Sequence, residues 1–213
     1  MDLERRARPL LVVLSGLVAA ACGTVVLAGW CFRLPALTDF GSRRIPMAPS
    51  TALLFVVLGL AIAVAARSEP PRAAWASFVL FVLSASAALL VSGLLGYRPG
   101  IEHLGLRVEG QVAGIPLGHM SPITAAAFLL ASAGLLAGVP RPGARRRLSQ
   151  LATACGLLVI AGSGLFLLAY LAGEPLFYGQ GLIPPAAPTS VSFLALGAGL
   201  VLLSRREARA RDG

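Results

Sequence analysis

The chain has 213 residues, of which 57% are hydrophobic and only 13% are charged, and its mean hydropathy is +0.82. A soluble globular domain has about a quarter of its residues charged. The low charge content therefore excludes an ordinary soluble domain and favours a protein of the lipid bilayer, where unpaired charge is expensive.

Six apolar stretches have, or nearly have, the roughly 20 residues that a helix needs to cross a bilayer. They cover about residues 9–32, 51–66, 73–97, 123–139, 151–172 and 191–204. The second, fourth and sixth are short, but proline is tolerated in a first helical turn, so each can begin one turn earlier. The sequence predicts an all-α, polytopic membrane helical bundle of six transmembrane helices. One membrane domain would cover 1–204, followed by a basic tail at 205–213.

The first stretch is interpreted as a membrane span. It follows a basic flank, but its apolar run exceeds a typical signal-peptide core and shows no clear small-residue cleavage site. The segment "VAAACG" at 18–23 resembles the end of a lipoprotein signal. Lipoprotein processing at Cys22 is therefore kept as an alternative.

Arginine is unevenly divided between the two sides of the predicted bundle. All 18 basic residues are arginines, and 13 of them flank the spans on the side that holds both chain ends. The remaining five are Arg33, Arg43, Arg44, Arg98 and Arg107. Because cytoplasmic loops of membrane proteins are enriched in arginine and lysine, both termini are predicted to be cytoplasmic. The net charge of +9 is attributed to this bias, with the lipid bilayer as partner and no nucleic acid.

A short pattern of threonine, phenylalanine and a small residue opens the second, fourth and sixth stretches. Spacing of i, i+4 and i+8 places its three members on one helix face. The copies are Thr51, Phe55 and Gly59; Thr124, Phe128 and Ser132; and Thr189, Phe193 and Gly197. This repeat predicts three tandem hairpins, over about 9–66, 73–139 and 151–204.

Each member of the pattern has a structural interpretation and a functional one. Threonine before an apolar run is an N-cap candidate, the small residue lets a neighbouring helix approach closely, and phenylalanine fills the space beside that approach. Alternatively, three helix starts converge beneath the outer loops. Their free N–H groups and partial positive charge would then hold an anion or a polar ligand near Thr51, Thr124 and Thr189.

The two histidines, His103 and His119, both lie in the second outer loop. With Glu102 and Glu109 they have the side chains that zinc prefers. Their spacing of sixteen matches no compact metal motif, so no metal site is predicted. Glu102, His103 and His119 are kept as candidate ligand-binding residues, with a loop-stabilising role as the alternative.

The chain has no recognisable catalytic constellation, and no enzymatic activity is predicted for it. Cys22, Cys31 and Cys155 lie in apolar runs and are interpreted as small buried side chains. The predicted spans contain no Asp, Glu, Lys or Arg in their middles, which disfavours a proton or ion relay. The residues indicate no particular cofactor. Small residues in the third and fifth stretches suit tight helix packing and leave a homodimer open.

The segments "MAPSTALLFVVLG" and "MSPITAAAFLLAS" resemble the repeated hairpin in N-terminal membrane regions of bacterial sensor histidine kinases and of signalling proteins linked to PAS or GGDEF modules. "LLGYRPGIEHLGL" at 94–106 resembles the opening of the second outer loop in that family. In the family, asparagine is common before the motif threonine, where this chain has Ser50 and Ile123. Histidine is common where the third copy has Pro188.

The resemblance implies a membrane-embedded sensory or input module of a bacterial signal-transduction protein. It would pass a signal from the outer side, or from within the membrane, to a cytoplasmic kinase, PAS or GGDEF module in cis or in trans. No such output module is expected within this chain. The alternative function is a small-molecule carrier or an accessory subunit of a membrane complex.

Overall fold

The computed structural model describes residues 2–41, 45–66, 72–108, 110–112, 115–138, 146–173 and 184–212. Within these ranges the protein is helical except for short connections. The elements in chain order are α1 (Asp2–Cys31), α2 (Pro35–Thr38), α3 (Pro49–Ala65), α4 (Arg72–Leu94), the 3-10 helix η1 (Gly100–His103), β1 (Gln111–Val112), β2 (Ile115–Pro116), α5 (Pro122–Gly138), α6 (Arg146–Leu171) and α7 (Ala187–Asp212). The two strands pair antiparallel, with Gln111 opposite Pro116 and Val112 opposite Ile115.

A helix covers each of the six predicted apolar stretches, so the all-α prediction is confirmed. Four helices are long and apolar enough to cross a membrane, at Pro9–Cys31, Ala73–Leu94, Arg147–Leu171 and Ala187–Arg205. The helices α3 and α5 have 17 residues each and are shorter than that length. Six spans in three hairpins therefore stay a prediction.

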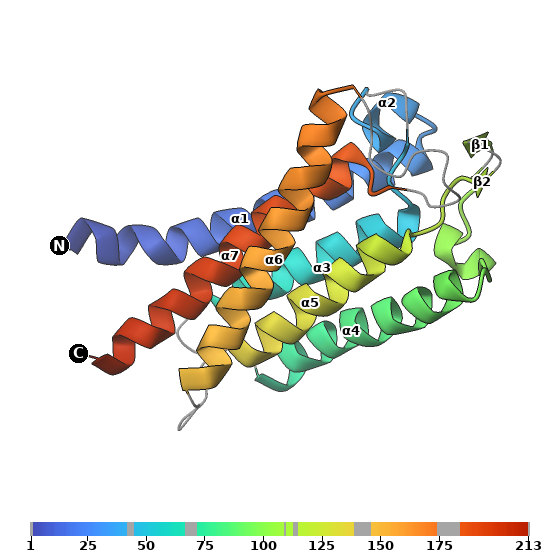
Figure 1. The fold of residues 1–213 in the computed structure, drawn as a ribbon. Coiled ribbons are helices and arrows are strands. Elements are labelled where there is room, and N and C mark those ends of the chain that lie inside the picture. The colour runs from blue at the N-terminus through green and yellow to red at the C-terminus, as the bar shows by residue number, and fades with distance from the viewer. Residues whose placement is uncertain are drawn as a thin grey trace.

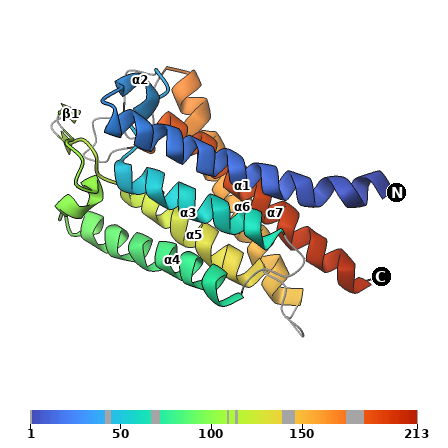
Figure 2. The ribbon, with the colours of Figure 1, turned by 180° about the vertical axis from the view of Figure 1, so that it is seen from behind.

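The long helices form an inner group, α3, α5 and α7, and an outer group, α1, α4 and α6 (Figures 1 and 2). Each outer helix packs on two inner ones: α1 on α3 and α7, α4 on α5 and α3, and α6 on α7 and α5. In the most apolar window of α7, 67% of residues are buried, against 22–33% in the outer helices. The inner helices therefore form the core of the bundle.

Three phenylalanines meet at the centre of the inner group. The rings of Phe55, Phe128 and Phe193 lie 4.7 Å apart, centroid to centroid, in all three pairs. Each is at most 2% exposed. The rings are tilted or edge-to-face, which is the favourable geometry for aromatic pairs. Residues that share a position in the sequence pattern thus share a position around one axis, and we call them the phenylalanine triad.

The starts of the inner helices correct one prediction. Thr51 is the third residue of α3, whose N-cap is Ala48 and has no side-chain cap bond. Thr124 is the third residue of α5, and its backbone N–H donates to Ser121 Oγ at 3.1 Å. Thr189 is the third residue of α7. The N-cap role predicted for threonine is wrong because proline or alanine takes the first helical position and moves the cap upstream.

The close-approach role of the small residue is confirmed in two copies. A Cβ on Gly59 would lie 2.5 Å from the backbone oxygen of Gly16 in α1. A Cβ on Gly197 would lie 2.9 Å from that of Gly156 in α6. Only glycine lets these backbones meet. In the second copy Ser132 is fully buried.

Large apolar side chains cover the outside of the bundle. The outer helices expose Leu14, Leu17, Phe78, Phe81, Leu158 and Leu165, each more than 40% accessible. Such a surface on three sides suits lipid better than water. Both chain termini lie at one end of the bundle, and α2 and the β-hairpin lie at the opposite end, which we call the loop end (Figure 1).

Candidate functional site

The buried threonines of the pattern, Thr51, Thr124 and Thr189, lie at the starts of the three inner helices, and we call them the threonine layer. Thr51, Thr124 and Thr189 are 2–3% exposed, and each precedes a phenylalanine of the triad by one helical turn. The hydroxyls of Ser50 and Ser190 lie next to two of these threonines in the sequence, are buried, and have no hydrogen-bond partner among the described residues. Polar side chains therefore lie at the starts of the inner helices, one helical turn before the phenylalanine triad.

The loop between α4 and α5 is held in place by a buried carboxylate. Glu102 is 5% exposed. Its Oε1 lies 3.0 Å from His119 Nδ1, and its Oε2 accepts the backbone N–H of Met120 at 2.6 Å. These bonds tie η1 to the segment that enters α5, which favours the loop-stabilising interpretation of Glu102 and His119.

His103 completes this cluster, and its buried ring nitrogen Nε2 has no hydrogen bond to any residue that the structure describes. The His103 ring lies 4.8 Å from the ring of His119. Gly118, with φ +83°, makes room for it, because a Cβ there would lie 3.1 Å from His103 Cδ2. The structure thus brings Glu102, His103 and His119 together. Among the described residues, no three His, Cys, Asp or Glu side chains are placed to hold a metal ion.

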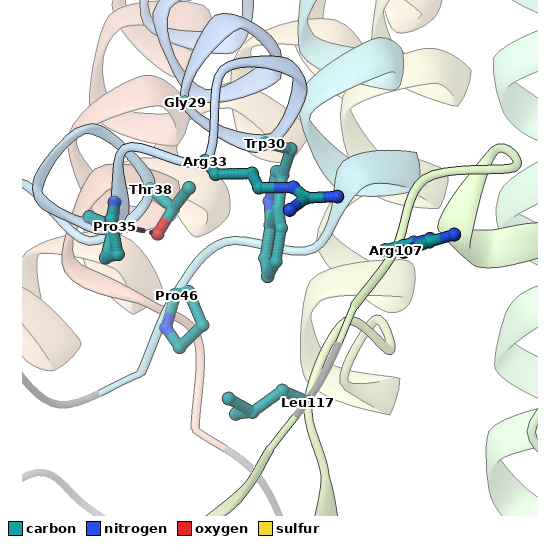
Figure 3. Close-up of a pocket in the computed structure, with 8 residues that line it drawn as sticks. All are labelled: Gly29, Trp30, Arg33, Pro35, Thr38, Pro46, Arg107 and Leu117. Carbon is teal, nitrogen blue, oxygen red and sulfur yellow. Dashed lines mark hydrogen bonds between the residues drawn. The ribbon is translucent and has the colours of Figure 1, made fainter.

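A pocket of about 410 Å³ opens at the loop end beside α1, and we call it the arginine–tryptophan pocket. Figure 3 shows Trp30 as one wall, Arg33 reaching across toward the loop that carries Arg107, and Pro46 and Leu117 on a further side. Its lining residues are Gly29, Trp30, Arg33, Pro35, Thr38, Pro46, Arg107 and Leu117.

The local sequence explains how this pocket forms. The α1 helix ends at Cys31, and Arg33 takes a left-handed backbone conformation with φ 55°. The N–H of Leu34 then turns back to the carbonyl of Gly29 at 2.8 Å, and Pro35 begins α2. Because Gly29 has no side chain, α2 can pack against α1.

Hydrogen bonding holds the aromatic wall of the pocket in place. The indole Nε1 of Trp30 donates to the backbone oxygen of Met47 at 2.8 Å. This bond links the end of α1 to the segment before α3. The indole face is therefore positioned before any ligand arrives, which lowers the entropy cost of binding.

The pocket carries positive charge that no acid in the described part of the chain neutralises. Arg33 and Arg107 are exposed. The ion pair seen in the described part of the chain joins Glu102 and His119 and involves neither arginine. Of the described loop-end acids, Asp39 accepts the N–H of Gly41 at 2.8 Å, and Glu102 is fully engaged. Arg43, Arg44 and Glu109 lie outside the described residues.

A second pocket, of about 280 Å³, lies between α5, α6 and the start of α7. It is almost wholly apolar and reaches Thr124, Ser190 and Phe193 from the side of the bundle. The threonine layer is thus accessible in part from the membrane side.

Sequence reasoning found the residues of the buried cluster but missed the arginine–tryptophan pocket. In the sequence, Arg33 and Arg107 served only as topology signals. A comparison of the chain with known protein families, curated proteins and solved structures finds no match. The resemblance to sensor kinase membrane regions therefore stays a prediction.

Proposed function

We propose that this chain is the membrane-embedded input module of a bacterial signalling protein of the inner membrane. In this proposal the loop end faces outward and both termini are cytoplasmic. The output is a kinase, PAS or GGDEF module, joined to the chain or bound to it. A homodimer is compatible with the proposal.

The observation that carries this proposal is the course of α7. It begins at Ala187 beside the loop end and continues as one helix to Asp212 at the opposite end. On the way it contributes Thr189 to the threonine layer and Phe193 to the phenylalanine triad. A change of packing at the loop end would therefore move a helix whose far end leaves the bundle.

Hydrogen bonds connect α7 to α6 near the end of α7 that leaves the bundle. Ser149 Oγ donates to the backbone oxygen of Ser204 at 2.9 Å. Thr153 Oγ1 lies 2.8 Å from Ser204 Oγ. Polar bonds between helices in an apolar environment fix their register. We infer that α6 and α7 move together and present the segment after Ser204 to the output module.

The test is a fusion of the full chain to a cytoplasmic histidine kinase module, with autophosphorylation as the readout. Thr51→Val, Thr124→Val and Thr189→Val each replace a buried hydroxyl with a methyl group of similar size. We expect each substitution to change basal kinase activity at least about twofold. A change of about 0.5 kcal/mol in the free-energy difference between the two signalling states is enough to shift their equilibrium that far.

The matched control is Thr24→Val, since Thr24 is exposed on α1 and its hydroxyl bonds only within its own helix, to the carbonyl of Ala20. Kinase activity equal to the parent fusion in all four variants would contradict the proposal. Uptake of a solute by vesicles that contain the chain alone would favour the carrier alternative instead, for which the apolar pocket between α5 and α6 is the supporting feature.

A further inference from the structure

We propose that the arginine–tryptophan pocket is a binding site for a small anion, a carboxylate or a phosphate, that carries an apolar body. This inference names the ligand class for the sensory role proposed above and depends on that role for its biological meaning. Binding itself is measurable without any output module.

The charge of the pocket selects an anion. A guanidinium group offers a planar set of N–H donors that matches a carboxylate or a phosphate, and it stays charged at all relevant pH values. Arg33 reaches across the pocket toward the loop that carries Arg107 (Figure 3). Arg107 also lines the pocket, and in this view its side chain points away from the other labelled residues. Because neither has an acidic partner in the described chain, an incoming anion displaces no existing ion pair.

The walls of the pocket select the rest of the ligand. Trp30 offers an indole face, and Pro35, Pro46 and Leu117 add apolar surface. Thr38 lies on the floor with its hydroxyl already donated to the carbonyl of Pro35 at 2.8 Å. A volume of about 410 Å³ is in the range of sites for small molecules, which are mostly apolar with a few polar groups.

The position of the pocket connects a ligand to the core. It is built by the end of α1, by α2, by the segment that enters α3 and by the second outer loop. A ligand that draws Arg33 toward the loop of Arg107 would pull on two connections, the one between α1 and α3 and the one between α4 and α5. The first leads into Thr51 and the second into Thr124, so occupancy would be felt at the threonine layer.

Two sources could supply this chemistry, a soluble anion and the headgroup of an anionic lipid, and the experiment separates them. The full chain in nanodiscs of neutral phosphatidylcholine is titrated by calorimetry with benzoate, with inorganic phosphate and with benzamide. Benzoate has both the anion and the apolar body, phosphate lacks the body, and benzamide lacks the charge. We expect saturable binding of benzoate, weaker binding of phosphate and none of benzamide.

Substitution then assigns the contact. We expect Arg33→Gln to weaken benzoate binding by about tenfold or more, since hydrogen bonds to charged groups contribute that much. Arg33→Lys keeps the charge but loses the planar donors, so it should bind benzoate more weakly than the parent and more tightly than Arg33→Gln. Arg98→Gln is the matched control, because Arg98 is exposed on the same outer loop as Arg107 and does not line the pocket.

The lipid arm uses tryptophan fluorescence. The chain has two tryptophans, and Trp75 is bonded to Ala61 of α3, so Trp75→Phe leaves Trp30 as the reporter of the pocket. A spectral change that grows with phosphatidylglycerol in the nanodisc, and that Arg33→Gln abolishes, would identify a lipid headgroup as the anion.

The proposal is overturned if benzoate, phosphate and phosphatidylglycerol all give no response. It is also overturned if benzamide binds as well as benzoate, or if folded Arg33→Gln and Arg33→Lys bind like the parent. Anion binding without any change in the kinase fusion would contradict the sensory role and leave the site standing. Kinase changes in the threonine variants without anion binding would do the reverse.

Discussion

The helix pairs α1–α3 and α6–α7 differ from the pair α4–α5 in how their two helices meet. In α1–α3 and α6–α7, a pair of glycines brings backbone against backbone, through Gly16 with Gly59 and Gly156 with Gly197. In α4–α5 the small-residue position holds Ser132, and the facing outer helix buries Ser86. Within the part of the chain that the structure describes, neither serine hydroxyl has a hydrogen-bond partner. The three copies therefore share their phenylalanine and threonine but not their helix contact.

This difference separates two layers of the architecture. In the phenylalanine triad, which joins the inner helices, the distance between ring centroids is 4.7 Å in all three pairs. The contact between each inner helix and its own outer helix differs between copies. Substitutions at shared positions should thus have equal effects in every hairpin, whereas substitutions at the small-residue position should not.

The largest effect is expected at the triad. Phe55→Ala, Phe128→Ala and Phe193→Ala each open a cavity at the centre of the bundle, and each should lower the free energy of unfolding by about 3 kcal/mol. Steric trapping in bicelles would measure it. The lipid-facing Phe78, 57% exposed, is the control, and Phe78→Ala should change little. Clearly unequal losses at the three triad positions would show that the shared positions are not equivalent.

The next largest effect distinguishes the hairpins. In Gly59→Ala and Gly197→Ala the new methyl group meets a facing backbone oxygen, and the unfolding free energy should fall by about 1–3 kcal/mol, as for overpacked cores. Gly164→Ala in α6 is the matched control, because a Cβ there meets nothing within 4 Å. That variant should be neutral or more stable, since alanine favours helix over glycine. Equal losses in all three variants would remove the steric explanation.

The sequence carried most of the fold, because apolar runs and a short repeat are local signals. The spacing of Thr51, Phe55 and Gly59 was enough to place three residues on the buried face of a helix. The helix start could not be placed as accurately. Proline before the threonine was compatible with either side of the boundary, and in the structure proline or alanine takes the first helical position, so the threonine lies inside the helix.

The candidate site was predictable only in part, since sequence distance hides contacts across loops. Glu102 and His119 are seventeen residues apart, and only the fold shows that they share a bond. Arg33 and Arg107 come from two different loops, so no spacing rule links them. Arginines in loops are used to predict which side of the membrane each loop faces, and their number on each side does not show which of them line a pocket.

The smallest effect should appear at the serine of the second hairpin, and its sign is the informative part. Ser132→Ala removes a fully buried hydroxyl that has no hydrogen bond to any described residue, so the folded state loses an uncompensated polar group. We expect the free energy of unfolding to stay the same or to rise by up to about 1 kcal/mol. The same trapping assay should therefore show no loss of stability in Ser132→Ala, in contrast to Gly59→Ala, although both substitutions place alanine at the same point of the pattern. A loss of stability in Ser132→Ala as large as in Gly59→Ala would mean that the hydroxyl contributes a contact to the hairpin, and the middle copy would then be as tightly specified as the other two.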